Sequence, residues 1–303
     1  EGFVDPAEDF IWEGPFGDHT GFYSLADWYP KLHVTCITHR KNAVYPATIV
    51  GIPPMEDAYI GLATERIFLT PIRMSMVPEL KDMVLPVAGV AHNFTIVKIQ
   101  KSFPGQAVKV MNSLWGAGQM MFNKVLVVVD ADTDIKDPVE IGKVFVKYFD
   151  TSYSLHFSKG PLDVLDHASN KFAFGSKLGI DLTKPFDVEK IERKETLKTG
   201  ILNSERLKLL PEVTRFRDLR NEFNIPVLMV NVEKDSNYSK RSLITGMLEA
   251  NVSELFSVVM LFNHGADLND LFTVFWLLGG NLEPMRDVTI ENDKTGNEVV
   301  FVD

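Results

Sequence analysis

The sequence predicts an α/β fold, in which strands and helices alternate along most of the chain. Val125 to Val129 are five consecutive apolar residues, which is typical of a strand buried on both faces of a parallel sheet. Asp137-Pro138 then opens a helical stretch that runs to about Phe149. The same order of elements returns toward the C-terminus. These observations predict an α/β domain with a largely parallel sheet, followed by a second α/β unit.

Short strands bounded by glycine and proline are expected in residues 1–55. The stretches His33 to His39 and Asn42 to Val50 both mix β-branched residues with alternating polarity, as antiparallel strands do.

Residues 57–76 carry apolar side chains at a helical spacing, which predicts a helix. Asp57 is the candidate N-cap of that helix.

The middle of the chain alternates strand and helix until it reaches residues 158–185. That stretch is rich in Gly, Pro, Asp and Asn and has no clear periodicity, so we expect a long loop there. The elements expected before it are strands at 92–100, 125–129 and 152–157 and helices at 104–114 and 137–149.

A charged connector, residues 187–198, precedes the last part of the chain. A helix is expected from about Glu205 to Phe223, with Pro211 near its start or kinking it. The remaining expected elements are strands at 226–232, 256–262 and 298–302 and helices at 239–250 and 268–278.

Positions 94–149 and the positions 133 residues further on are predicted to form the same elements. Val125 corresponds to Val258 in this way, and Asp137 to Asp270. Few paired residues are identical, but the apolar positions coincide in phase. Either the second unit is a degenerate duplicate of the first, or two βαβ units share a common length by coincidence. A different strand order in the two sheets would exclude duplication. The expected divisions are 1–55, 56–186 and 187–303.

Composition narrows the class of protein. The net charge of −10 disfavours nucleic acid and anionic membranes as partners, because binding to phosphates needs clustered Lys and Arg. A single cysteine, Cys36, cannot form an internal disulfide, which favours a reducing cytoplasm. No apolar run is long enough to cross a membrane, and no signal peptide is visible. We therefore expect a cytoplasmic protein.

The stretch that most clearly suggests a catalytic role is residues 13–23, which read Glu-Gly-Pro-Phe-Gly-Asp-His-Thr-Gly-Phe-Tyr. Its glycines and proline exclude a regular helix and predict a tight, mostly polar loop. Glu13 and Asp18 could be held there in separate environments, one paired with a cation and one shuttling a proton. A carboxylic acid with a raised pKa suits proton transfer to carbon. A solvated turn with two surface acids is the alternative.

Residues 13–23 resemble the E-G-P-[FWY]-G-[DE]-[HY]-x-G-[FY] signature of the UbiD family of decarboxylases, which use prenylated flavin. The resemblance continues in order along the chain and covers about the first 185 residues. The later matching segments are Tyr45–Pro54, Lys124–Asp130, Leu165–Ser169 and Gly175–Asp181.

The resemblance implies a carboxy-lyase (a lyase) that removes CO₂ from an aromatic or α,β-unsaturated acid. It points to a ubiquinone or menaquinone precursor, such as a polyprenyl-hydroxybenzoate, as the substrate. Asp18 matches the family's proton donor, and Glu13 matches the partner of an arginine. That arginine lies upstream in the family, and no Arg of this chain has a matching context.

Other site residues follow from their position in the family. His19, Ile60, Asn123 and Leu162 would line the substrate pocket over the flavin. His19 suits loop capping equally well, and Ile60 and Leu162 equally suit an apolar core. Lys177, in a Gly-Ser-Lys segment, lacks the pattern of a nucleotide-binding P-loop, so its role stays open.

The family's cofactor is prenylated FMN, held with a divalent metal (Mn or Mg) and potassium through ligands that all precede this chain. Residues 1–55 would then be the C-terminal strands of the flavin-binding split β-barrel. The seven histidines show no metal-binding spacing, so no metal site is expected here. We expect the C-terminal portion of a longer enzyme, inactive and without flavin on its own. Family members are homo-oligomers, from dimer to hexamer, so a non-catalytic oligomerisation or interaction module is the alternative.

Overall fold

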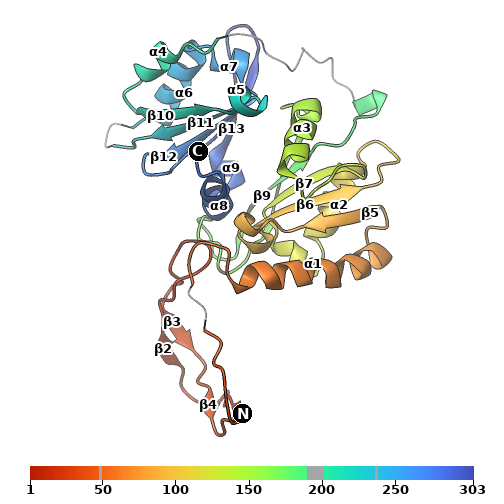
Figure 1. Cartoon of the computed structure of the whole chain (residues 1–303), viewed down its shortest axis with the longest axis vertical. Helices are drawn as coiled ribbons and strands as arrows, with labels where there is room; N and C mark the ends of the chain where they lie inside the picture. Colours follow the sequence, from red (N-terminus) through yellow and green to blue (C-terminus); the bar gives the residue numbers. More distant parts are fainter. Residues whose placement is uncertain (48–49, 190–200, 236–237) are drawn as a thin grey trace.

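The computed structural model describes residues 1–47, 50–189, 201–235 and 238–303. An extended N-terminal arm stands off from two α/β units, each built on a five-stranded sheet (Figure 1). Most of the predicted charged connector, residues 190–198, lies outside the described residues. No helix within the described ranges is both long and apolar enough to span a bilayer.

Two short antiparallel ribbons form the arm. Strand β1 (Gly2–Phe3) pairs with β4 (His33–Val34), and β2 (Ile11–Glu13) pairs with β3 (Asp27–Tyr29). The prediction of strands at 33–39 and 42–50 is wrong beyond Val34 for the residues described. In this antiparallel pair Val34 lies opposite Gly2, the first residue of β1, so the β-branched residues that follow run past β1 and do not pair with it.

Helix α1 (Glu56–Ser75) leads from the arm into the first unit. Met55 is its N-cap residue and makes no side-chain capping bond, so the prediction that Asp57 caps this helix is wrong. Asp57 lies in the first turn, where its charge suits the helix dipole, and its carboxylate faces His19 instead.

The first unit has a mixed sheet in the order β5-β6-β7-β9-β8. Its three central strands are parallel, and each edge strand is antiparallel to its neighbour. The elements are β5 (Leu80–Val84), η1 (Val87–Gly89), η2 (Ala91–Asn93), β6 (Phe94–Ile99), α2 (Gln106–Trp115), η3 (Gly118–Phe122), β7 (Val125–Asp130), α3 (Pro138–Tyr148), β8 (Leu155–Pro161), β9 (Phe174–Asp181) and η4 (Asp187–Glu189).

The prediction of one long loop at 158–185 is wrong, because β9 crosses the sheet there as a parallel strand beside β7. Its glycines reflect close packing and not a turn. A Cβ added at Gly179 would lie 2.3 Å from the Met111 sulfur, so only glycine lets α2 approach the strand this closely. The actual loop covers 162–173, between β8 and β9.

The second unit has a sheet in the order β10-β11-β12-β14-β13. The helix predicted from Glu205 to Phe223 is wrong, because two short helices flank an edge strand there. Pro211 cannot continue the first helical stretch, and the chain goes on as a strand from Val213. The elements are α4 (Ser204–Lys208), β10 (Val213–Asp218), α5 (Leu219–Phe223), β11 (Val227–Val232), α6 (Lys240–Glu249), α7 (Val252–Leu255), β12 (Val258–Asn263), α8 (Leu271–Asn281), α9 (Pro284–Asp287), β13 (Val288–Asn292) and β14 (Glu298–Val302).

Strand order and direction are the same in the two sheets. Register agrees as well: Phe94 lies opposite Val125 in the first sheet, and Val227 lies opposite Val258 in the second. The edge pairs β5–β6 and β10–β11 also each carry an irregularity, between Leu80 and Asp82 in the first unit and between Val213 and Arg215 in the second. The positions involved are again 133 residues apart.

Helices α3 and α8 lie between the two sheets (Figure 1). Apolar side chains from both sheets and both helices form one continuous core cluster. The contact is close: a Cβ added at Gly142 of α3 would lie 2.6 Å from Ile225 of the second unit. Reciprocally, Phe275 of α8 packs edge-on against Phe94 of the first unit, with ring centroids 4.6 Å apart. The two units therefore share a core.

Candidate active site

The motif at 13–23 forms the connection between β2 and β3, at the end of the arm that meets the two units (Figure 1). Backbone bonds close it tightly: Ser24 N donates to Phe16 O at 2.7 Å, and Asp18 N donates to Phe22 O at 3.0 Å. Gly21 has φ +89°, a conformation that favours glycine. The loop thus presents Asp18 in a fixed direction.

Asp18 is held by its two following neighbours. Thr20 Oγ1 donates to Asp18 Oδ2 at 2.7 Å, and His19 Nδ1 lies 3.0 Å from Asp18 Oδ1. Burial alone would raise the pKa of Asp18, but the hydrogen bonds from His19 and Thr20 outweigh it and lower the pKa to about 2. The structure therefore does not give Asp18 the raised pKa that suits a proton donor.

His19 is the group whose proton affinity is increased. Its hydrogen bond to Asp18 raises its pKa above the ordinary value, against the opposing effect of burial. The nearby charges of Asp57 and Asp163 add to this, and Asp57 Oδ2 lies 3.6 Å from His19 Nδ1. Around neutral pH a larger fraction of His19 is therefore protonated than of a free histidine.

The loop at 162–173 lies next to the motif loop. His92 Nε2 lies 3.2 Å from Asp163 Oδ2, and the pKa of Asp163 is lowered, chiefly by its hydrogen bond with His92. The rings of His167 and Phe22 are 5.6 Å apart. The motif loop, η2 and the 162–173 loop thus bring two imidazole–carboxylate pairs to one region.

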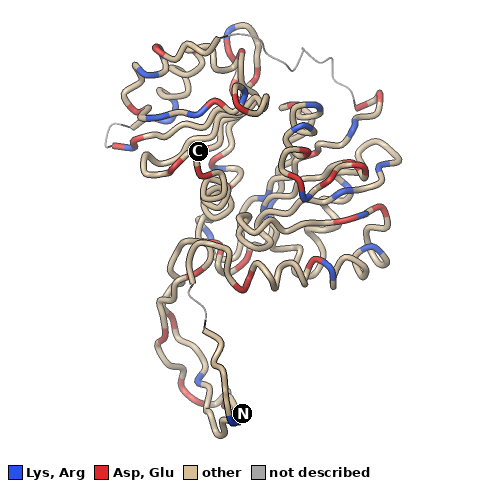
Figure 2. The backbone as a smooth tube through the Cα atoms, in the orientation of Figure 1, with Lys and Arg blue, Asp and Glu red and all other residues tan. Residues whose placement is uncertain are grey.

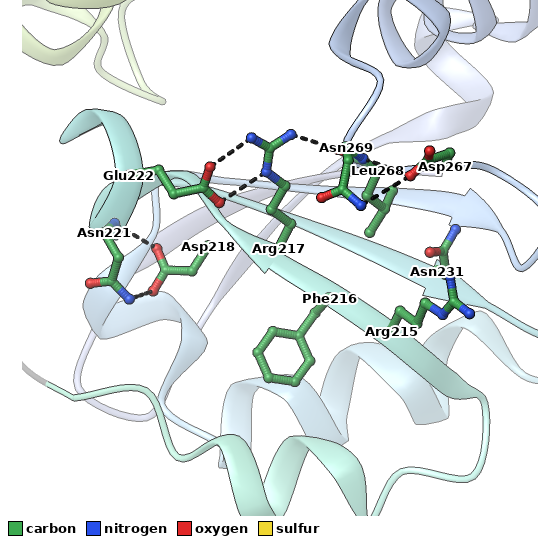
Figure 3. A pocket seen from close by; sticks show the side chains of 10 residues that line it. All are labelled: Arg215, Phe216, Arg217, Asp218, Asn221, Glu222, Asn231, Asp267, Leu268 and Asn269. Atoms are coloured by element: carbon green, nitrogen blue, oxygen red, sulfur yellow. Dashed lines mark hydrogen bonds and ion pairs between the residues drawn. The ribbon is translucent and has the colours of Figure 1, made fainter.

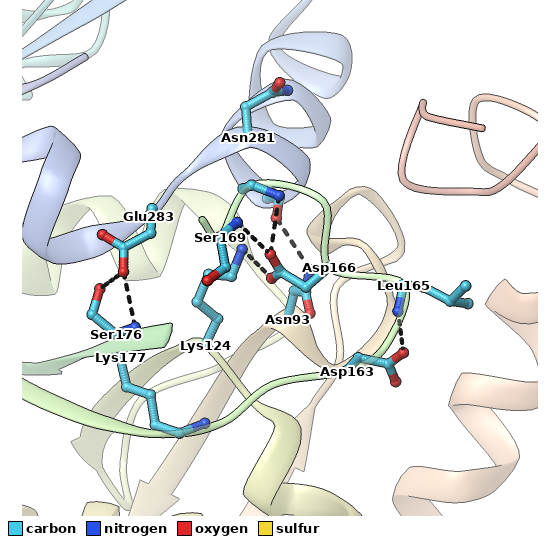
Figure 4. A network of polar contacts seen from close by, with 12 residues as sticks. Asn93, Lys124, Asp163, Leu165, Asp166, Ser169, Ser176, Lys177, Asn281 and Glu283 are labelled. Atoms are coloured by element: carbon cyan, nitrogen blue, oxygen red, sulfur yellow. Dashed lines mark hydrogen bonds and ion pairs between the residues drawn. The ribbon is translucent and has the colours of Figure 1, made fainter. Parts of the chain in front are cut away.

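A buried polar network supports this second loop. Figure 4 shows the Lys124 ammonium directed at the Asp166 carboxylate, and these two fully buried groups form an ion pair. Burial lowers the pKa of Lys124. Asp166 Oδ1 also accepts hydrogen bonds from the backbone N–H groups of Ala168 and Ser169, both at 3.1 Å. The motif Leu165–Ser169 therefore folds around the carboxylate that balances Lys124.

Lys177 belongs to the interior and not to a surface phosphate site. Its Nζ donates to the carbonyl oxygens of Met121 and Asn123, both at 2.6 Å. Burial lowers its pKa to about 8.

The other predicted site residues are spread over different environments. Glu13 is exposed on β2, and its carboxylate has no hydrogen bond or ion pair within the described residues. Ile60 is exposed on α1, whereas Leu162 is buried. Asn123 is fully buried, donates to the carbonyl oxygens of His92 and Val125, both at 2.9 Å, and accepts from Trp115. Contact of these residues with a substrate stays a prediction.

A small cavity lies beside His19, the neighbour of Asp18. The cavity lined by His19, Asp57 and the start of α1 measures about 20 Å³, room for about one water molecule. Neither an aromatic acid nor a flavin fits in this cavity. No group of three or more His, Cys, Asp or Glu in the described ranges is placed to hold a metal ion.

A larger pocket of about 390 Å³ lies on the second unit, at the carboxyl ends of β11 and β12 (Figure 3). Most of its charged groups form hydrogen bonds with each other or with neighbouring backbone groups. Arg217 makes two bonds to Glu222, at 2.9 and 2.6 Å, and Asp218 caps α5. Asp267 accepts from the Asn269 backbone in a tight turn. None of these groups lies in the predicted site.

Several residues around Asp18 were not predicted as part of the site. Asp57 was interpreted only as a helix cap, and His92 and Asp163 received no role. They come from α1, η2 and the 162–173 loop, and nothing in their local sequence indicates that they meet. Only Asp18, His19 and Thr20, which are adjacent in the chain, could have been grouped from the sequence.

Comparisons with known proteins agree with the motif. The model of the 3-octaprenyl-4-hydroxybenzoate carboxy-lyase Rift-related domain matches residues 1–53, and the model of the C-terminal domain of that carboxy-lyase matches residues 58–182. An uncharacterised protein of Aquifex aeolicus strain VF5 is 47% identical over 194 residues, which cover 64% of this chain and 40% of the relative. One from Helicobacter pylori strain J99 is 34% identical over 310 residues, covering 100% of this chain and 47% of the relative.

The chain thus spans less than half the length of these relatives. Among solved structures, the UbiD-class enzyme HmfF from Pelotomaculum thermopropionicum, in complex with FMN, is 27% identical with a TM-score of 0.52, over 64% of this chain and 43% of that one. The open form of vanillic acid decarboxylase from Sedimentibacter hydroxybenzoicus shares the fold, at 24% identity and a TM-score of 0.58, over 68% of this chain and 44% of that one. On the two family-model matches, which together cover more than half of its residues, this chain belongs to the UbiD family.

Proposed function

We propose that this chain supplies the proton-handling side of a UbiD-type decarboxylase, which acts on an aromatic or α,β-unsaturated acid. The observation that carries the proposal is the Asp18–His19 pair, hydrogen-bonded at 3.0 Å on a rigid glycine–proline loop within the family motif. Loss of CO₂ leaves an electron pair on carbon, which must be protonated. The prenylated flavin of the family would supply the electron sink for that loss.

His19 would hold the proton and Asp18 would deliver it. Because the pKa of Asp18 is lowered and that of His19 is raised, a proton held by the pair resides on the imidazole and not on the carboxylate. Transfer from His19 Nδ1 to Asp18 Oδ1, and from there to the carbon, returns Asp18 to its carboxylate form. Water would then reprotonate His19.

Flavin, divalent metal (Mn or Mg) and potassium would be bound mainly by parts of the protein other than the described residues. The match of residues 1–53 to a Rift-related domain supports the proposal that the arm contributes the last strands of the flavin-binding split barrel. Glu13, exposed on β2, would there meet the family's arginine. On this proposal the 303-residue chain alone neither binds flavin nor turns over substrate.

A quinone precursor is the proposed substrate, since the matching family models describe a 3-octaprenyl-4-hydroxybenzoate carboxy-lyase. His19 would contact this substrate, and Ile60, Asn123 and Leu162 would shape its pocket. Asn123 and Leu162 would act from the interior, because both are buried. A homo-oligomeric, cytoplasmic enzyme is part of the same proposal.

We also propose that the second unit arose as a duplicate of the first. Common strand order, common register and the shared edge irregularity support this. So do the equivalent helix caps Asp137 and Asp270, each of which accepts a backbone hydrogen bond at the start of α3 or α8. Coincidence of length alone does not require agreement in register and capping.

The test of function uses the full-length protein, co-expressed with a prenyltransferase that makes the cofactor and assayed against a panel of aromatic and unsaturated acids. Asp18→Asn should retain the flavin absorbance and reduce turnover by roughly 10²-fold or more, the range expected on loss of a general acid. Asp9→Asn removes an exposed carboxylate from the same arm and should leave turnover unchanged. Near-normal turnover in Asp18→Asn would remove Asp18 from its role.

A further inference from the structure

We infer that α8 of the second unit is a positioning element for Asp18, and that Trp276 is the residue through which it acts. This inference rests on the proposed function, because it concerns how the proposed acid is aimed. It gives residues 201–303, for which the sequence indicated no role, a specific part in the same site.

Three consecutive residues of the motif loop contact α8. Trp276 Nε1 donates to the His19 carbonyl oxygen at 2.8 Å, across 257 positions of sequence. A Cβ added at Gly21 would lie 2.7 Å from the Trp276 ring, so the indole packs directly on the backbone there. A Cβ added at Gly280 would lie 2.7 Å from the Thr20 carbonyl oxygen. The loop therefore rests on α8 by its backbone.

Two of the residues whose backbones contact α8 are also the ones whose side chains bind the Asp18 carboxylate. The side chains of His19 and Thr20 make the bonds to the two Asp18 carboxylate oxygens, at 3.0 and 2.7 Å. Fixing the backbones of His19 and Thr20 against α8 therefore fixes the direction of the carboxylate. A small displacement of a reacting group lowers the reaction rate by a large factor, so loss of this contact should lower turnover.

Helix α8 is itself anchored to the first unit and is not a free element. Asn93 Nδ2 donates to the Gly279 carbonyl oxygen at 3.3 Å, and a Cβ added at Gly279 would lie 3.2 Å from Gly89. Phe275 packs against Phe94. Figure 1 shows α8 at the place where the arm and both units meet. The platform beneath the motif loop thus has a fixed position relative to α1 and Asp57.

The segment that follows α8 holds the second loop of the site. Arg286 Nη1 donates to the Ala168 carbonyl oxygen at 2.8 Å. Glu283 accepts from the Ser176 backbone at 2.9 Å and from its hydroxyl at 2.5 Å, as Figure 4 shows. One stretch of the second unit therefore fixes both the motif loop and the loop that carries Asp163.

The test compares Trp276→Phe with Asn281→Ala in the full-length protein. The first removes the indole donor to His19 and keeps an aromatic ring over Gly21. The second removes an exposed side chain of α8 whose one hydrogen bond to the described residues stays within its own helix, at Leu277 O. For each variant, hydrogen–deuterium exchange of the peptide covering 14–24 and the pH profile of kcat are measured, together with flavin content.

We expect Trp276→Phe to speed exchange in the 14–24 peptide by roughly fivefold, the effect of one lost hydrogen bond. We also expect it to lower kcat by at least that factor, with KM and flavin content unchanged. Its pH profile should move toward lower pH, because a loosened Asp18–His19 pair lets the His19 pKa fall, although Asp57 and Asp163 still face it. Asn281→Ala should change none of these quantities.

Wild-type exchange at 14–24 in Trp276→Phe would overturn the inference, whatever the activity. Faster exchange with unchanged kcat and pH profile would also overturn it, since the contact would then be structural only. If the wild-type protein decarboxylates nothing, the proposed function fails while the exchange result still reports whether Trp276 holds the loop. The two failures are therefore distinguishable.

Discussion

At the residue scale, the chemistry of the site depends on which of two neighbouring groups carries a proton. Asp18 and His19 follow each other in the chain, and the tight loop turns their side chains together so that Nδ1 and Oδ1 lie 3.0 Å apart. The pair could be predicted from the motif because it is local. Asp57, Asp163 and Trp276 could not, because tertiary packing brings them in from separate elements.

The raised pKa of His19 predicts how stability depends on pH. A group whose folded pKa exceeds its unfolded pKa stabilises the folded state fully below the unfolded value of about 6.5. That contribution is lost as the pH rises through the folded pKa. Unfolding free energies from urea titrations should therefore fall as the pH rises above about 6.5, and they should fall less in His19→Gln. An equal fall in variant and wild type would assign the pH dependence to other groups.

At the element scale, the strands with continuous apolar runs and the helices α2, α3, α6 and α8 were predicted to within a few residues, whereas β9 and β10 were not. β7, β11 and β12 are buried on both faces, so their sequences carry the strand signal by themselves. β9 has the composition of a loop because Gly179 makes room for Met111. β10 was mistaken for a helix because a short edge strand between two short helices gives little period-2 signal.

The two equivalent caps should contribute alike to stability. Asp137→Ala and Asp270→Ala each remove the side-chain acceptor at the start of a helix, from the Val139 N–H in α3 and from the Thr273 N–H in α8. We expect each to cost about 1 kcal/mol of unfolding free energy. Asn at either position keeps an acceptor and should cost less than half as much. A negligible effect at only one position would show that the two caps are not equivalent.

At the scale of the whole molecule, the shared core should make the two units one cooperative body. Their sheets face each other across α3 and α8, and a single apolar cluster includes side chains from both sheets. The sequence predicted two α/β units but gave no sign that each helix packs against the neighbouring unit, since amphipathicity shows that a face is buried and not what covers it.

Phe275→Ala tests this cooperativity. Phe275 is partly buried in α8 and contacts Phe94 of the first sheet, so its truncation should cost roughly 2–4 kcal/mol. If the units unfold together, hydrogen exchange should quicken by the same factor in β7 of the first unit and β12 of the second. Phe272→Ala, at a more exposed position of the same helix, should change both strands little. Faster exchange confined to β12 would mean that the second unit opens independently, and α8 could not then hold the motif loop while its own unit is open.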